Sequence, residues 1–219
     1  MHAWKETGVH ASAFPNAYIS TDEPPRRSAL RRGLCLLAVS GVSYLGLVIL
    51  ALSLFTTAYS PVSQVASDYG VGAYAFWMNS GFLLAGLGVL SLGGVLATGD
   101  RGRTERTGGA LLFVSGLALV LNSAFATDIE GSAQTFHGDV HALAGVLFFI
   151  AASLGVLLVS RGFGRSWFRS VSLGLVVAAT FLALDGVLGL DASGLGERVA
   201  ILVIFSSTIL IAARVYRES

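Results

Sequence analysis

The chain has 219 residues, of which 54% are hydrophobic and only 12% are charged, and its net charge is +1. Soluble domains carry about 25% charged residues, and no globule of this size can hide so much apolar surface from water. The composition therefore excludes a water-soluble fold and indicates an integral membrane protein. The near-neutral net charge gives no reason to expect nucleic acid as a partner.

The chain opens with a polar segment. Residues 1–32 contain three of the four prolines and are predicted to form a disordered tail. The apolar run that follows begins too late and is too long for a signal peptide, so none is expected. Residues 33–215 are predicted to form a six-helix transmembrane domain, and residues 216–219 a second short tail.

Six apolar runs make up the predicted transmembrane domain. Each is close to the ~20 residues that a helix needs to cross the hydrocarbon core of a bilayer. None contains proline, so each can form a continuous hydrogen-bonded helix. The pattern predicts an all-α, six-transmembrane-helix bundle. The runs cover residues 33–57, 74–98, 107–126, 136–160, 167–188 and 197–214.

Basic residues alternate with the six runs. Of the 14 Lys and Arg residues, 13 lie in the first tail, in the loops after the second and fourth runs, or at the end of the chain. Arg198, before the sixth run, is the exception. Lys and Arg collect on the cytoplasmic side of membrane proteins, so both termini are predicted to be cytoplasmic. The protein is expected to be a multi-pass protein of the cell membrane.

Small residues recur four positions apart within the runs, and this spacing lets membrane helices approach closely. Packing within the chain is the favoured interpretation, and contact within a homo-oligomer is the alternative. The pairs are Gly81/Ala85, Gly138/Ala142, Ala151/Gly155 and Gly174/Ala178.

Polar and ionisable residues collect at the helix ends on the predicted outer side. Such residues are costly in a membrane and mark functional sites there. We expect Asp128, His137, His141 and the Glu197–Arg198 pair to converge in one outer pocket. Two asparagines in the same half, Asn79 and Asn122, are expected to hydrogen-bond between helices. The full set of candidate site residues is Asp128, His137, Asp139, His141, Asp185, Glu197 and Arg198.

The two histidines suggest a metal site. His137 and His141 are one helical turn apart, so both rings can reach one ion. With Asp128 as a third ligand and a bound water, they would form a catalytic zinc set, and Asp185 and Glu197 are the less favoured alternatives for the oxygen ligand. The predicted activity is metal-assisted hydrolysis of a lipid or amphiphile, with Asp128 or Asp139 as ligand or base. In the alternative interpretation, the histidines hydrogen-bond to acids on neighbouring helices and serve only structure.

Arg198 has two interpretations of its own. As the one outer basic residue it is expected to pair with Asp128, Asp185 or Asp191. Such an ion pair would lock the sixth helix. Alternatively, Arg198 would bind the phosphate or carboxylate of a lipid, with Glu197 and Asp185 completing the substrate site.

Other cofactors and functions find less support. Haem is not expected, because one helical turn cannot supply both axial ligands and His2 and His10 lie in the tail across the membrane. No nucleotide-binding loop is present.

The non-enzymatic alternative is a lipid-binding protein or an accessory subunit of a membrane complex. A transporter ranks third, because no run is broken by proline. Membrane lipids are the expected partners, and a homo-oligomer or a larger membrane complex is the alternative.

Short motifs resemble those of the membrane proteins grouped as domain-of-unknown-function family 998. They are Phe125-Ala126-Thr127-Asp128, His137-Gly138-x-x-His141, Gly196-Glu197-Arg198 and Phe76-Trp77-Met78-Asn79-Ser80-Gly81. The resemblance covers roughly residues 35–215 and implies a six-helix bundle without an assigned activity. The first motif usually reads Phe-Pro-Thr-Asp in that family. Ala126 replaces the proline here, which alters the turn but keeps the acid.

A more distant similarity is to membrane hydrolases of the alkaline ceramidase and adiponectin-receptor type. Those proteins combine an aspartate with an H-x-x-x-H pair around zinc. This chain has six predicted helices where they have seven, and it lacks their additional histidine.

Overall fold

The computed structural model describes residues 25–57, 59–129 and 131–219, apart from the side chains of residues 25 and 181–186. In these residues it contains α-helices and two short 3-10 helices, and no strand, so the predicted all-α fold is confirmed. The α-helices are α1 (Pro25–Phe55), α2 (Ala75–Thr98), α3 (Arg103–Ala124), α4 (Phe136–Gly162), α5 (Arg165–Leu188) and α6 (Ser193–Glu218), and the 3-10 helices are η1 (Ala66–Gly70) and η2 (Gly72–Tyr74).

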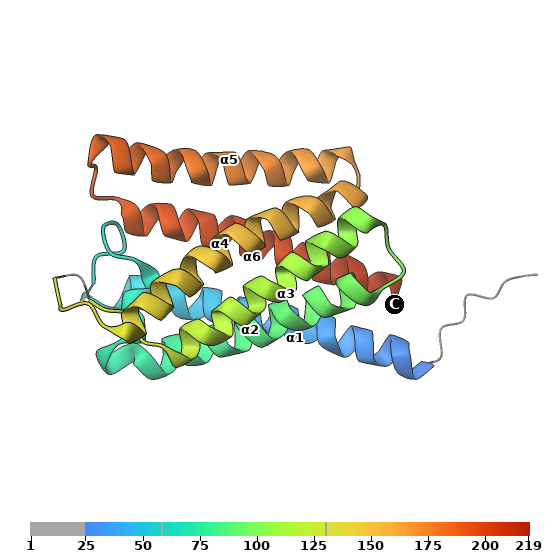
Figure 1. Cartoon of the computed structure of the whole chain (residues 1–219), viewed down its shortest axis with the longest axis horizontal. Coiled ribbons are helices and arrows are strands. Elements are labelled where there is room, and N and C mark those ends of the chain that lie inside the picture. The colour runs from blue at the N-terminus through green and yellow to red at the C-terminus, as the bar shows by residue number, and fades with distance from the viewer. Residues whose placement is uncertain (1–24, 58, 130) are drawn as a thin grey trace, which may run out of the picture.

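Among the described residues, five α-helices are long and apolar enough to cross a membrane, namely α1, α2, α3, α4 and α6. The chain is therefore a membrane protein. Successive helices run in opposite directions (Figure 1). The segments 56–74, 125–135 and 189–192 meet at one end, which we call the histidine end. The start of α1, the two short turns 99–102 and 163–164 and the C-terminus lie at the other end, which we call the arginine end.

The helices extend beyond the predicted apolar runs at the arginine end. α1 begins at Pro25 and α6 continues to Glu218. Proline is well tolerated in the first turn of a helix, where its missing N–H would be unpaired anyway. The arginines that follow continue the helix, whereas an apolar run marks only the part that a membrane covers. Residues 1–24, most of the predicted tail, lie outside the described residues.

Glycines bring the first four helices into close contact. A Cβ atom on Gly116 of α3 would lie 2.7 Å from the carbonyl oxygen of Gly86 on α2, so the two backbones touch there. Gly108 of α3 faces the carbonyl oxygen of Gly155 on α4 in the same way, at 2.9 Å. Gly155 belongs to one of the predicted small-residue pairs, and its contact lies within the chain. Such contacts fix α2, α3 and α4 as a tight layer.

The arginine end is tied together by ion pairs. Arg101, in the turn between α2 and α3, donates from Nη2 to Glu218 at 2.7 Å and from Nη1 to Glu105 at 3.2 Å. Glu218 also accepts from Arg214 Nε at 2.9 Å. Burial lowers the pKa of Arg101, but the hydrogen bonds to Glu218 and Glu105 outweigh it and leave the pKa above its ordinary value. The end of α6 is thus fastened to the α2–α3 turn.

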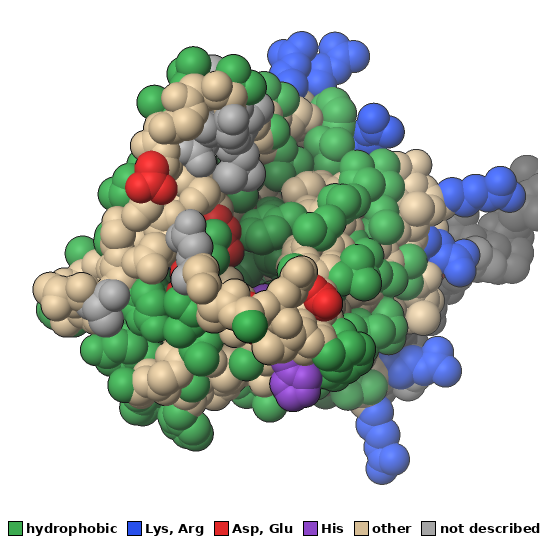
Figure 2. All heavy atoms as spheres, turned by 60° about the vertical axis from the view of Figure 1, so that its left-hand side comes forward, with side chains coloured by type: hydrophobic (Ala, Val, Ile, Leu, Met, Phe, Trp, Pro, Cys, Tyr) green, Lys and Arg blue, Asp and Glu red, His purple; other side chains and the backbone are tan. Residues whose placement is uncertain are grey.

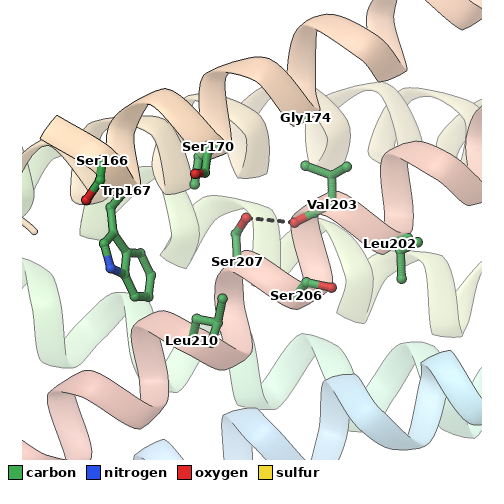
Figure 3. Close-up of a pocket in the computed structure, with 10 residues that line it drawn as sticks. Ser166, Trp167, Ser170, Gly174, Leu202, Val203, Ser206, Ser207 and Leu210 are labelled. Carbon is green, nitrogen blue, oxygen red and sulfur yellow. Dashed lines mark hydrogen bonds between the residues drawn. The ribbon is translucent and has the colours of Figure 1, made fainter.

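α5 lies at the edge of the bundle, beside α6 (Figure 1). Near the arginine end, α5 and α6 enclose a groove of about 490 Å³ that contains several serines (Figure 3). The hydroxyl of Ser207 is satisfied inside its own helix, because it donates to the carbonyl oxygen of Val203 at 2.7 Å. Trp167 and Leu210 face each other at one end of the groove, as Figure 3 shows.

Candidate functional site

A cavity of about 450 Å³ opens at the histidine end. Its walls come from α1, α2, α3, α4, α6 and the 56–74 segment. Figure 2 shows a hollow on this end of the molecule with hydrophobic side chains at its base, while Arg side chains stand at the far edge of the view. The cavity is therefore on the end of the bundle that the sequence marks as rich in histidine and acids.

His141 is the first polar group of the cavity. It lies on α4, is 6% exposed, and its Nδ1 is 2.8 Å from the carbonyl oxygen of Phe125. A carbonyl can only accept, so Nδ1 must carry the proton. In the neutral ring, Nε2 is then a hydrogen-bond acceptor. The ring also packs edge-on against Phe82, with centroids 5.9 Å apart. These contacts hold the imidazole in one orientation.

Asn122 is the second polar group. It lies in the last turn of α3 and is 4% exposed. Its Oδ1 is buried and has no hydrogen-bond partner among the described residues. The predicted bond between helices is therefore not formed at this atom. An unpaired buried carbonyl costs roughly 1–3 kcal/mol, so a partner supplied from inside the cavity would be favourable.

Glu197 completes the polar part of the lining. It reaches the cavity from the first turns of α6, and its Oε2 accepts a hydrogen bond from the backbone N–H of Ala66 at 2.5 Å. Two hydroxyl residues, Ser67 and Thr127, line the cavity beside it. His141 and Glu197, two of the predicted site residues, are thus brought together on one cavity.

The rest of the lining is apolar. It extends along α4 to Ile150 and along α6 to Phe205. At about 1.5 Å per residue, Ile150 is about 13 Å further along α4 than His141. On the α4 side, Val146 is 57% exposed and Ile150 is 56% exposed, so this wall borders the outside of the bundle. The cavity thus has a polar end, an apolar body and a side that faces the membrane region.

Asp128 serves as a structural clasp next to the cavity. Its Oδ2 accepts from the backbone N–H of Thr135 at 2.7 Å, and its Oδ1 accepts from the Thr135 hydroxyl at 2.8 Å. Thr135 is the N-cap of α4 and accepts in turn from the N–H of Gly138 at 3.1 Å. A Cβ atom on Gly138 would overlap the Asp128 carboxylate. Asp128 of the Phe-x-Thr-Asp motif therefore packs directly against Gly138 of the His-Gly motif.

His137 lies outside the cavity. It is exposed, and its ring packs against Phe125 with centroids 5.5 Å apart. The two histidines share a helical face, but His137 is exposed, whereas Gly138 and His141 are buried. Asp139 is also exposed and accepts from Gln134 at 2.8 Å. Within the described chain, no three His, Cys, Asp or Glu side chains are grouped to hold one metal ion.

Arg198 binds the backbone rather than the predicted acids. Its Nη1 donates to the carbonyl oxygens of Gln64 at 2.8 Å and Gly194 at 2.9 Å, and its Nε donates to Ser53 at 3.2 Å. No ion pair joins Arg198 to Asp128 or Asp191, and the side chain of Asp185 lies outside the described residues. The reason is the 56–74 segment, which folds over the start of α6 and presents its carbonyl oxygens there.

Sequence reasoning missed the role of the 56–74 segment. This segment fixes Glu197 through Ala66 and Arg198 through Gln64, and it also bonds to Asn79, whose Nδ2 donates to the carbonyl oxygen of Gly70 at 3.1 Å. These partners are backbone atoms, so no residue type in the sequence signals them. Asn122 was visible as a polar residue within an apolar run, which is the signal that could have placed it in a site.

Comparison with known proteins adds a family but no activity. The family described as "Protein of unknown function (DUF998)" matches residues 24–214. No curated protein and no solved structure matches the chain.

Proposed function

The chain belongs to the DUF998 family of proteins of unknown function, and from the cavity we propose that it binds a membrane amphiphile with a hydroxyl-bearing head and a hydrocarbon tail. The observation that carries this proposal is the buried, unpaired Oδ1 of Asn122 at the polar end of an otherwise apolar cavity. A ligand that donates a hydrogen bond to this atom and also fills the apolar body gains binding free energy from both contacts.

The chemistry of the head follows from the groups that face it. Asn122 Oδ1 and His141 Nε2 are acceptors, and the Glu197 carboxylate is an acceptor when ionised. Acceptors select donors, so the head must carry hydroxyl or amine hydrogens. A neutral polyol head, such as the glycerol of a monoacylglycerol, satisfies several acceptors without bringing a charge into the membrane.

The tail follows from the shape of the cavity. The lining beyond His141 is apolar, and the α4 side borders the outside of the bundle at Val146 and Ile150. An amphiphile could enter sideways from the bilayer with its head near the histidine end. We place that end on the outer side of the cell membrane, because the described arginines of the turns lie at the arginine end and favour the cytoplasm.

Photolabelling tests this proposal. The purified full chain would be irradiated with a monoacylglycerol that carries a diazirine in its acyl chain, and the labelled peptides identified by mass spectrometry. We expect label on α4 between Ala142 and Ile150 and on α6 near Phe205. Excess unlabelled monooleoylglycerol should remove the label. Label spread evenly over the outside of the helices would contradict the proposal.

Three variants sharpen this test. Asn122→Leu should lower labelling about fivefold, the worth of roughly one hydrogen bond. His141→Asn preserves a donor for the Phe125 carbonyl but removes Nε2, and should also lower labelling. Ser123→Ala is the matched control, because Ser123 is the neighbour of Asn122 and its hydroxyl bonds within α3 to Val120 at 2.7 Å. Its labelling should equal that of the unaltered protein.

Metal-assisted hydrolysis is the second candidate and stays a prediction. It requires His137, His141 and Asp128 to meet at one ion, and therefore a turn of the exposed His137 side chain toward the cavity. Metal analysis of protein purified without chelator tests it. One zinc per chain, lost in both His137→Ala and His141→Ala, would support the hydrolase. Release of fatty acid from the bound monoacylglycerol would then identify the reaction.

A further inference from the structure

A second groove of about 610 Å³ runs between α1 and α6, on the outside of the bundle. It adjoins the cavity, because Ile49, Ile201 and Phe205 line both. Its outer rim consists of leucines that are more than half exposed. They are Leu47 at 64%, Leu50 at 54% and Leu202 at 67%.

The groove has the length and direction of one acyl chain. It extends on α6 from Arg198 to Ile209 and on the antiparallel α1 from Ser53 to Val42. Each stretch covers about 16 Å at about 1.5 Å per residue. Half of a bilayer's hydrocarbon core is about 15 Å thick. The groove therefore follows one leaflet from the level of the lipid head groups to the middle of the membrane.

A cation stands at the head-group end of this groove. The guanidinium of Arg198 donates from Nε to Ser53 and from Nη1 to two backbone carbonyl oxygens, and its centre is 5.9 Å from the Tyr69 ring centroid. Its Nη2 has no hydrogen-bond partner among the described residues. The acceptors of its hydrogen bonds are neutral oxygens, and the neighbouring Glu197 carboxylate interacts with its charge. The unpaired Nη2 would be satisfied by an additional acceptor oxygen, such as that of a phosphate.

We propose that the α1–α6 groove binds an anionic phospholipid of the bilayer, with one acyl chain along the groove and the phosphate at the Arg198 guanidinium. Arginine is suited to this role, because its planar fork matches the geometry of phosphate oxygens. Nη2 offers the two unused donors. Nη2 is buried, so the proposal requires the guanidinium to shift toward the groove to bring these donors to the phosphate. This site lies outside the cavity and does not depend on the amphiphile proposed there.

Native mass spectrometry of the full chain in detergent tests this site. Dioleoylphosphatidylglycerol and dioleoylphosphatidylcholine would be titrated separately and the bound lipids counted. We expect about a fivefold preference for the anionic lipid, the effect of one basic residue near a charged lipid. Arg198→Gln should abolish the preference. Arg103→Gln is the matched control, since it removes the same charge from an exposed residue at the arginine end and should keep the preference.

A second variant, which blocks the groove sterically, tests the proposal even if Arg198→Gln fails to fold. Gly46 lines the groove, and a Cβ atom there would meet Phe205 at an ordinary 3.8 Å, so Gly46→Leu should fold and fill the groove. It should reduce the binding of both lipids at least fivefold. Gly33→Leu, on an open part of α1, should bind both lipids normally. Equal binding of the two lipids by the unaltered protein, or unchanged binding by Gly46→Leu, would overturn the proposal.

Discussion

At the scale of the residue, the histidine motif combines two different roles. His141 faces the cavity with its ring fixed by the Phe125 carbonyl, while His137 packs on the surface of the same turn. The sequence predicted that both lie on one helical face, and they do. It could not predict that this face is covered only from Gly138 onwards, because the cover comes from other parts of the chain, such as Asp128 and Phe125.

Gly138 gives a sharp test of the Asp128 clasp. A Cβ at this position would overlap the Asp128 carboxylate, which binds the N-cap residue Thr135, so Gly138→Ala should destabilise the protein by about 1–3 kcal/mol. Gly145→Ala is the control on the same helix, because nothing lies within 4 Å of its added Cβ. It should be neutral or stabilising, since alanine favours helix over glycine. Thermal unfolding in detergent measures both, and equal melting temperatures for the two variants would contradict the clasp.

At the scale of the element, the helices were predictable and the 56–74 segment was not. Six proline-free apolar runs of membrane length could become only helices, and each lies within or close to one observed helix. The observed ends differ where arginines continue α1 and α6 beyond the apolar part. The segment between α1 and α2 carries neither periodicity nor a motif. Its two 3-10 helices and its backbone bonds to α6 arise from tertiary contact alone.

The contact between this segment and α6 can be loosened at one glycine. A Cβ on Gly194 would overlap the backbone of Gln64, so Gly194→Ala should push the segment away from α6. Ser193 donates to the Ser63 carbonyl at 2.7 Å in the same contact, and that bond should weaken too. We expect faster hydrogen exchange of residues 62–68, measured by mass spectrometry, with no change around 108–116. Unchanged exchange of residues 62–68 would show that the contact does not hold the segment.

At the scale of the whole molecule, the alternation of charge predicts how the bundle sits in the membrane. The described arginines of the turns lie at the arginine end, and the cavity opens at the other. In intact cells, single cysteines introduced into a Cys35→Ala background would show on which side of the membrane each position lies. Ser132→Cys, at the histidine end, should react with an impermeant maleimide added from outside. Arg103→Cys should react only after the membrane is opened, and the reverse pattern would contradict the orientation.

The function was less accessible from sequence than the fold. The sequence identified the end of the bundle that bears the cavity and two of its polar groups, His141 and Glu197. It also predicted a metal site on His137, His141 and Asp128, which stays a prediction; in the structure, Asp128 accepts hydrogen bonds from Thr135, the N-cap of α4. Asn122, whose unpaired oxygen points to a ligand, differs from a structural asparagine only by the absence of a partner. Such an absence becomes visible only in three dimensions.

The central claim is that the cavity selects a hydroxyl-bearing amphiphile through its acceptors. The most direct measurement compares the binding affinity of monooleoylglycerol with that of its di-O-methyl ether, which has the same tail but no donor. The unaltered protein should bind the diol at least about fivefold more tightly, since at least one hydrogen bond is lost in the ether. In Asn122→Leu this ratio should fall toward one. Equal affinity of the unaltered protein for the two ligands would contradict the account.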